Sequence, residues 1–158
     1  MQLTRPTKGN AAIVLAVLAT LFLSVAFIGS RASSSGGRVD PCVHPPEVKT
    51  RGHVTLQADA MKAFRKAQRT MHGRIEVVSS YRTCAQQAVT CQRICGNPNG
   101  CPGTCIKPGY SYHQLGLAID VTQETLDTAG AKASLEAAGW CQSVPDTDPG
   151  HFSFRGCH

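Results

Sequence analysis

The chain has few aromatic and few charged residues, and both shortages narrow the classes of protein to which it can belong. Aromatic residues make up 6% and charged residues 16% of its 158 residues. Nowhere do aromatic and basic side chains interleave as they do on nucleic-acid-binding surfaces. No internal repeat is evident, and the length allows one domain.

Acidic residues are missing before Asp40, and this absence accounts for most of the positive charge. The formal net charge is +6, from 16 basic and 10 acidic residues. Four of the 16 basic residues precede Val39, which leaves 12 against all 10 acidic ones in the rest of the chain. The domain alone is therefore close to neutral, and we expect no nucleic-acid partner.

Cysteine is also absent from the N-terminal part, which carries one long apolar run instead. The run from Ala11 to Ile28 follows two basic residues and contains only two polar ones. Its length, about 18 residues, just suffices to span a bilayer as a helix and is long for a signal peptide. We expect residues 1–31 to be a signal anchor or a signal peptide. Either would place the domain outside the cytoplasm, membrane-anchored through a single span or secreted.

Residues 32–40 separate this run from the rest of the chain. Their stretch Ala-Ser-Ser-Ser-Gly-Gly predicts a flexible linker. The remaining residues, 41–158, are enough to bury a core of their own.

All eight cysteines follow the apolar run, at Cys42, Cys84, Cys91, Cys95, Cys101, Cys105, Cys141 and Cys157. An even number in a small exported domain favours disulfides, although their connectivity cannot be deduced. The alternative is a four-thiolate zinc site in the segment 91–105. Its C-x3-C-x5-C-x3-C spacing is tight for a zinc ribbon, and thiols tend to pair in an oxidising compartment, so we expect disulfides.

Hydrophobic periodicity predicts helices and strands in mixed order. Helices are expected at 56–72, 83–94 and 129–138, and strands at 74–79, 117–121 and 151–154. This order predicts an α+β domain in which flanking helices cover a small, largely antiparallel sheet.

Two histidines and two carboxylates have a spacing that suits a metal site. His113 precedes Asp120 in one motif, and His151 follows Asp148 by three residues. Three protein ligands with an open fourth position are typical of catalytic zinc sites. His113, Asp120 and His151 are therefore candidate ligands for one Zn²⁺ per chain, and Asp148 is a candidate general base.

The separation of His113 from Asp120 makes a demand on the backbone. In a regular strand, residues seven apart point to opposite faces. A shared metal therefore requires a bend between them, and Gly116 is the residue best able to provide it.

Three motifs together resemble the zinc D,D-peptidases of the VanY-like D-alanyl-D-alanine carboxypeptidase family. They are S-x-H-x-x-G-x-A-x-D at 111–120, Ser-Ser-Tyr-Arg-Thr at 79–83 and Asp-Pro-Gly-His at 148–151. The resemblance runs from roughly Val54 to Phe154 and implies the fold of these peptidases and of the hedgehog signalling domain. The family usually has glutamate, often in Glu-x-Trp-His, where this chain has Asp148 and Gly150. Because aspartate is one methylene shorter, the base would have to lie closer to the metal.

The resemblance also implies residues that act on the substrate. Arg82 matches the arginine of the S-x-Y-R motif, where a guanidinium can bind an oxyanion or a terminal carboxylate. A surface salt bridge is the alternative for Arg82. Ser111 and Gln87 match positions near the substrate. Asp146 competes with Asp148 for the role of base, but it does not stand three residues before the histidine.

These features predict an exported zinc metallopeptidase that cleaves peptidoglycan stem peptides as a D-alanyl-D-alanine carboxypeptidase. A wall-lytic endopeptidase is the alternative within the enzyme class. A non-catalytic zinc-containing binding module of the same fold, as in the hedgehog signalling domain, is the alternative outside it. The expected partners are the peptide substrate and, if the apolar run is uncleaved, a membrane.

Overall fold

The computed structural model describes residues 40–157. The predicted signal segment, 1–31, and all but the last residue of the predicted linker lie outside the described residues, so both stay predictions. Within the described part, no helix combines the length and the apolar character needed to cross a membrane.

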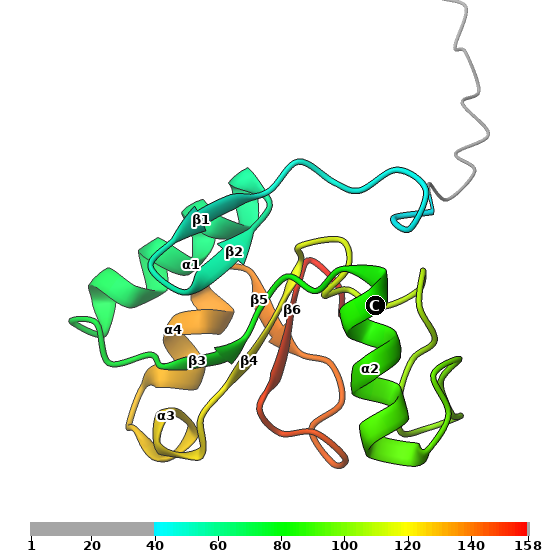
Figure 1. Cartoon of the computed structure of the whole chain (residues 1–158). Coiled ribbons are helices and arrows are strands. Elements are labelled where there is room, and N and C mark those ends of the chain that lie inside the picture. The colour runs from blue at the N-terminus through cyan, green and yellow to red at the C-terminus, as the bar shows by residue number, and fades with distance from the viewer. Residues whose placement is uncertain (1–39, 158) are drawn as a thin grey trace, which may run out of the picture. The chain divides into compact units, whose positions relative to one another are not determined.

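A four-stranded sheet with the strand order β3-β4-β6-β5 forms the centre of the fold (Figure 1). Its strands are β3 (Val77–Ser79), β4 (Ala118–Val121), β5 (Trp140–Gln142) and β6 (His151–Phe154), and all neighbours are antiparallel. A separate antiparallel hairpin pairs β1 (Lys49–Arg51) with β2 (Val54–Leu56). The predicted α+β fold with small antiparallel sheets is confirmed.

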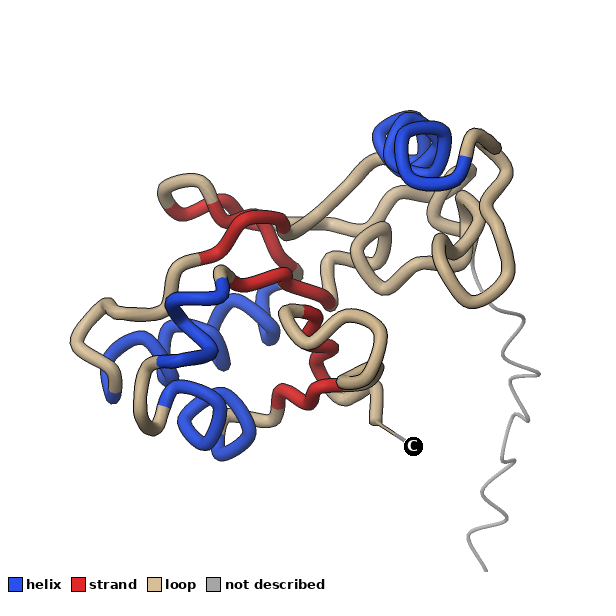
Figure 2. Tube along the Cα trace, turned by 90° about the horizontal axis from the view of Figure 1, so that it is seen from below, coloured by secondary structure: helices blue, strands red, loops and turns tan. Residues whose placement is uncertain are grey.

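Four helices flank the strands. They are α1 (Ala58–Thr70), α2 (Cys84–Cys95), α3 (Gln123–Asp127) and α4 (Ala131–Ala137). Figure 2 shows α1, α3 and α4 together on one side of the strands and α2 on the other side. The fold therefore has a helix-covered side and a side on which α2 stands alone.

Side-chain alternation along the strands decides which face of the sheet is the core. Ile119 of β4 and Phe152 of β6 are fully buried and pack in one cluster with apolar residues of α1 and α4. Successive side chains in a strand point to opposite faces. Asp120, which follows Ile119, and His151, which precedes Phe152, therefore point away from this core. The opposite face of the sheet is thus left for polar side chains.

The predicted elements are recovered with small shifts. The strand 151–154 has the predicted bounds, whereas the helix expected from residue 56 begins at Ala58, because Leu56 pairs with Lys49 in the hairpin. The strand expected at 74–79 is shorter and begins at Val77. The short elements β1, β2, β5 and α3 were not predicted.

Helix α2 is fixed at both ends by local structure. Thr83 caps it with a reciprocal pair of hydrogen bonds: its hydroxyl accepts from the backbone N–H of Gln86, and its own N–H donates to the Gln86 side chain. Gly96, in the left-handed conformation, ends the helix. The predicted helix with Thr83 near its cap is confirmed.

Disulfides attach α2 to the rest of the domain. All eight cysteines are paired, as Cys42–Cys84, Cys91–Cys105, Cys95–Cys101 and Cys141–Cys157. Three of these four bonds involve α2. The four cysteines of the segment 91–105 form two nested disulfides, so the expectation of disulfides holds there and no thiolate site is present in this structure.

Candidate metal centre and cleft

Asp120 and His151 face each other across two neighbouring strands. They are direct partners in the register of β4 and β6, and both point away from the core. Directly opposite residues in an antiparallel pair have their Cβ atoms about 5 Å apart. Accordingly, Nδ1 of His151 lies 2.9 Å from Oδ1 of Asp120.

His113 reaches the same point from a turn before β4, and Gly116 allows that turn. Gly116 has a φ of +66°, and its N–H donates to the carbonyl of His113 at 3.1 Å. A Cβ atom at Gly116 would lie 2.9 Å from a methyl group of Val48 and 3.0 Å from the backbone nitrogen of Gln57. Both the conformation and the lack of space therefore require glycine, at the position where the sequence predicted a bend.

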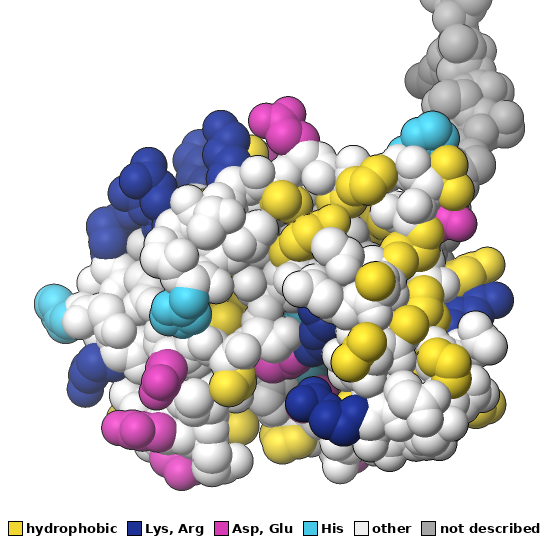
Figure 3. Space-filling view, viewed as in Figure 1, with side chains coloured by type: hydrophobic (Ala, Val, Ile, Leu, Met, Phe, Trp, Pro, Cys, Tyr) yellow, Lys and Arg dark blue, Asp and Glu magenta, His cyan; other side chains and the backbone are white. Residues whose placement is uncertain are grey.

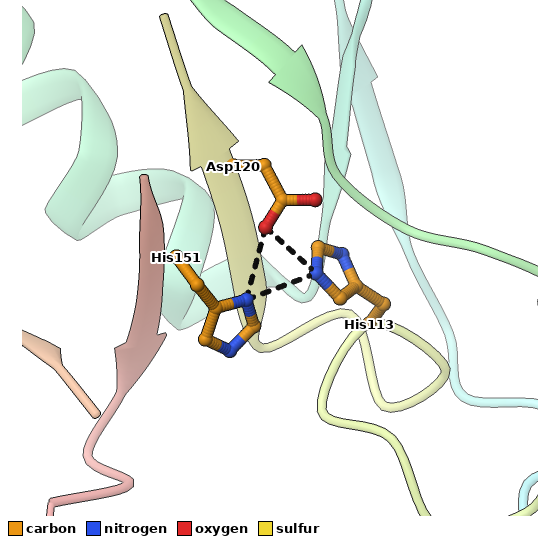
Figure 4. A group of neighbouring side chains, drawn as sticks. All are labelled: His113, Asp120 and His151. Atoms are coloured by element: carbon orange, nitrogen blue, oxygen red, sulfur yellow. Dashed lines mark hydrogen bonds and ion pairs between the residues drawn. The ribbon is translucent and has the colours of Figure 1, made fainter. Parts of the chain in front are cut away.

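Three donor atoms meet at this point, one from each predicted ligand (Figure 4). Nε2 of His113 lies 3.2 Å from Oδ1 of Asp120 and 3.3 Å from Nδ1 of His151. These three side chains, called the metal group below, could hold a metal ion. Ligands of a tetrahedral Zn²⁺ at about 2.0–2.1 Å from the ion are about 3.3 Å apart, so the donor types and their spacing both suit zinc.

The tautomer of His113 is determined by a backbone carbonyl. Nδ1 of His113 lies 2.5 Å from the oxygen of Ser80, which can only accept a hydrogen bond. The proton therefore resides on Nδ1, and Nε2 offers its lone pair to the metal group. Burial is the main cause that lowers the pKa of His113, and a lowered pKa favours the neutral form that binds metals.

His151 has a different partner on its far side. Its Nε2 lies 3.1 Å from the hydroxyl oxygen of Ser153, which is buried and lies 3.2 Å from the hydroxyl oxygen of Ser143. When Nε2–H donates to Ser153, Nδ1 keeps the lone pair that faces Asp120. The sequence analysis missed Ser153, although its position two residues after His151 in a strand places both side chains on one face.

Arg82 braces Asp120 from the side opposite the histidines. Its Nη2 forms an ion pair with Oδ2 of Asp120, its Nε donates to Ser79 at 2.9 Å, and its Nη1 donates to Gln87 at 3.2 Å. Burial would raise the pKa of Asp120, but in the metal-free site the contacts with His113 and His151 and the charge of Arg82 outweigh it and hold that pKa well below its usual range. Asp120 is therefore an anion.

Arg82 retains donors for a ligand despite this ion pair. A guanidinium has five N–H groups, and the three contacts above use one each on Nε, Nη1 and Nη2. One N–H on Nη1 and one on Nη2 remain. Burial lowers the pKa of Arg82, whereas the charges of Asp120 and Asp148 raise it. The salt bridge expected as an alternative is present, but it is partly buried and belongs to the site.

Gln87 and Ser111 both lie at the site and are buried. The amide of Gln87 accepts from Arg82 and donates to the carbonyl of Ile106 at 2.8 Å, so it holds Arg82 in place and ties α2 to the disulfide-bonded loop. The hydroxyl of Ser111 accepts from the backbone N–H of His113 at 3.3 Å.

A cleft of about 1750 Å³ opens over the metal group, and Asp148 lies on its wall. Arg82 and the three candidate ligands line it as well, whereas Asp146 is not among its lining residues. Figure 3 shows the hollow, with basic, acidic and histidine side chains together inside it. Asp148 is exposed and belongs to the turn before β6, where its carbonyl accepts from the N–H of His151 at 3.1 Å.

Gly150 explains one departure from the expected motif. A Cβ atom at this position would lie 2.8 Å from the backbone oxygen of Val121. No larger side chain fits there without a backbone shift, so this turn cannot carry the tryptophan that the resemblance leads one to expect.

Comparisons with known proteins agree with this fold and site. No curated protein sequence is significantly similar to the chain. Among solved structures, VanYB in complex with D-alanine-D-alanine is 18% identical with a TM-score of 0.58, covering 74% of this chain and 81% of its own. A mutant of the vancomycin-resistance D,D-pentapeptidase VanY in complex with Zn(II) is 18% identical with a TM-score of 0.52, covering 71% and 80%. At these identities the structures establish the fold.

The family follows from the sequence itself. The profile of the VanY D-alanyl-D-alanine carboxypeptidase family matches residues 53–154, well over half of the chain and all four of the residues that face one another in the cleft, Arg82, His113, Asp120 and His151. The chain belongs to the VanY D-alanyl-D-alanine carboxypeptidase family.

Proposed function

We propose that this chain is an exported zinc metallopeptidase that removes the terminal D-alanine from peptidoglycan stem peptides. The observation that carries the proposal is the convergence of Nε2 of His113, Oδ1 of Asp120 and Nδ1 of His151 in a cleft that also holds Asp148 and Arg82. Membership of the VanY family and the structural likeness to VanYB, which was solved with D-alanine-D-alanine, support it.

His113, Asp120 and His151 would hold one Zn²⁺. Zinc bound there supplies Lewis acidity, which polarises a peptide carbonyl and lowers the pKa of a water molecule toward 7. The backbone of Ser80 and the hydroxyl of Ser153 orient the two imidazoles, and Arg82 orients the carboxylate. All three ligand side chains are thus positioned before any metal binds.

Asp148 acts as the general base in this proposal. Its carboxylate is exposed in the cleft and makes no contribution to the donor group, so it is free to accept a proton. It takes the proton of the attacking water and passes it to the nitrogen of the leaving D-alanine.

Arg82 and Ser111 contact the substrate. The guanidinium of Arg82 places a positive charge at the cleft. Its two unused N–H groups bind the terminal carboxylate of the peptide or the developing oxyanion. Ser111 lines the same wall, and Gln87 keeps Arg82 in position. The apolar run at 11–28 would direct the domain to the cell wall, either as a signal anchor or as a cleaved signal.

Digestion of purified peptidoglycan with the full chain and Zn²⁺ tests the proposal, with the products weighed by mass spectrometry. Free D-alanine is the expected product. Release of D-alanyl-D-alanine or of larger fragments would overturn the carboxypeptidase assignment in favour of a dipeptidase or an endopeptidase. Binding of a stem peptide without any cleavage would make the chain a zinc-containing binding module.

A further inference from the structure

The cleft extends well beyond the metal group, and its walls are apolar. Five of the seven large hydrophobic side chains that are exposed in the described part of the chain line it; they are Val78, Val89, Ile94, Ile106 and Val144. Exposed apolar side chains that gather on one concave surface are typical of binding sites. Hydrophobic atoms are also seen in Figure 3 on the wall formed by α2.

Helix α2 adds one cation to this wall. Gln86, Val89 and Arg93 line the cleft and recur at the three- to four-residue spacing that places side chains on one face of a helix. Arg93 is exposed, and no carboxylate of residues 40–157 lies within ion-pair distance of it. The cleft therefore holds a positive charge that the described chain leaves without a counterion.

The length of the wall sets how much substrate it can contact. The part of α2 that lines the cleft runs from Ala85 to Ile94, which is a rise of about 13 Å. An extended peptide covers that distance with about four residues. The volume of about 1750 Å³ also exceeds the roughly 300–1,000 Å³ of ordinary small-ligand pockets. A cleft of this size is built for more than a dipeptide.

The direction of the substrate follows from the proposed function, on which this inference rests. An enzyme that removes one terminal residue has only that residue on the carboxyl side of the cleaved bond. All further length of the substrate lies on the amino side, so the remaining wall must contact the residues that precede the cleaved bond.

We propose that Arg93 is a specificity-determining residue, which binds the side-chain carboxylate of an acidic residue two to four positions before the cleaved bond. The apolar side chains around it contact the aliphatic parts of the same segment. Because the carboxylate remains unchanged during the reaction, Arg93 contributes equally to substrate and transition-state binding. It therefore lowers KM and leaves kcat nearly unaffected.

Steady-state kinetics with paired peptides tests this inference on the full chain with Zn²⁺. Each pair ends in D-alanyl-D-alanine and differs only by glutamate or glutamine at the second, third or fourth position before the cleaved bond. The wild-type protein should show a KM about twofold to fivefold lower for the glutamate peptide at one position, as expected for an exposed ion pair. Arg93→Gln should bring the two KM values of that pair close together.

Arg69→Gln is the matched control. Arg69 is likewise an exposed arginine in the last turn of its helix, α1, and it does not line the cleft. It should keep the wild-type ratio. Arg93 could instead act only on the partial negative charge that the helix dipole places at the C-terminal end of α2. In that case Arg93→Gln will lower the melting temperature and leave the ratio of the two KM values unchanged, which overturns the proposal.

The two proposals fail in different ways. If the wild-type protein cleaves both members of every pair with equal KM, the role of Arg93 is wrong and the carboxypeptidase assignment stands. If it cleaves none of the peptides, the proposed function itself fails. Equal loss of preference in Arg93→Gln and Arg69→Gln would also overturn the specific role of Arg93, since it would indicate a general effect of net charge.

Discussion

The hydroxyl oxygen of Ser153 lies 3.1 Å from Nε2 of His151, the ring nitrogen that does not face Asp120. Partners of this kind set which nitrogen of an imidazole is available to a metal, and their loss typically costs about 10- to 100-fold in metal affinity. Ser153 belongs to the same strand as His151, so the two side chains are held at a fixed separation by β6.

Ser153→Ala should therefore weaken Zn²⁺ binding by about 10- to 100-fold. Competition with a chromogenic chelator measures this. Ser134→Ala is the control, because Ser134 is another buried serine, which donates to the carbonyl of Ala67 far from the site. Both variants should lose some stability, but only Ser153→Ala should lose affinity. Equal affinities in the two variants would show that Ser153 has no orienting role.

Alanine at His113, Asp120 or His151 should abolish metal retention. Each replacement removes one of three donors, and the two that remain cannot complete a zinc site of this type. Metal analysis of the purified full chain should give about one zinc per wild-type chain and almost none per variant. A His151→Ala protein with its full zinc content would prove this ligand set wrong.

Asp148→Asn should keep its zinc and lose activity by about 10²- to 10⁴-fold, the usual cost of a missing general base. Asp148→Glu should retain measurable activity if the cleft accommodates one more methylene. Asp146→Asn is the matched control in the same turn and should behave as wild type. The reverse result, in which Asp146→Asn is inactive and Asp148→Asn is not, would move the base to Asp146.

The metal-free protein should lose stability as the pH falls below about 6.5. Burial lowers the pKa of His113 in the folded state from its ordinary 6.5, so the unfolded state binds the proton first and the free energy of unfolding falls with pH. The depressed pKa of Asp120 adds a loss of the same sign below about 3.8. Urea unfolding from neutral pH to about pH 4.5 should show the first loss, and His113→Gln should reduce its slope. An unchanged slope in His113→Gln would contradict the assignment.

All eight cysteines should be oxidised in the exported protein. Alkylation without reductant should label no thiol, and peptide mapping should recover Cys91 linked to Cys105 and Cys95 linked to Cys101. Four labelled thiols in the segment 91–105, accompanied by a second zinc, would instead favour the thiolate site.

The parts of the fold that the sequence predicted are those with a strong local signal. The strand 151–154 alternates polar and aromatic residues, and α2 begins with a capping threonine, so both were predicted close to their observed bounds. The strands β1, β2 and β5 have three residues each, which is too few to show a period. Their pairing depends on partners distant in sequence.

The candidate site also has parts that the sequence predicted and parts that it could not. The convergence of His113, Asp120 and His151 and the bend at Gly116 could be predicted from residue types and spacing, whereas the role of the three as zinc ligands stays a prediction. Gln87 was predicted near the substrate, but the sequence could not show that its amide is occupied by Arg82 and Ile106. Arg93 carried no motif, and its position became informative only when α2 was placed along the cleft.

Helix α2 contributes no residue to the main hydrophobic cluster of the described chain, and its disulfides are Cys42–Cys84, Cys91–Cys105 and Cys95–Cys101. The metal group stands instead on the sheet and the turn before β4. Reducing conditions should therefore loosen the wall that α2 forms, while the three candidate ligands stay in place. Under the proposed function, a chain in a reducing compartment would hold zinc without binding its peptide along α2, and cleavage would begin only after export. On this proposal, the three disulfides of α2 would confine the activity to the exported protein.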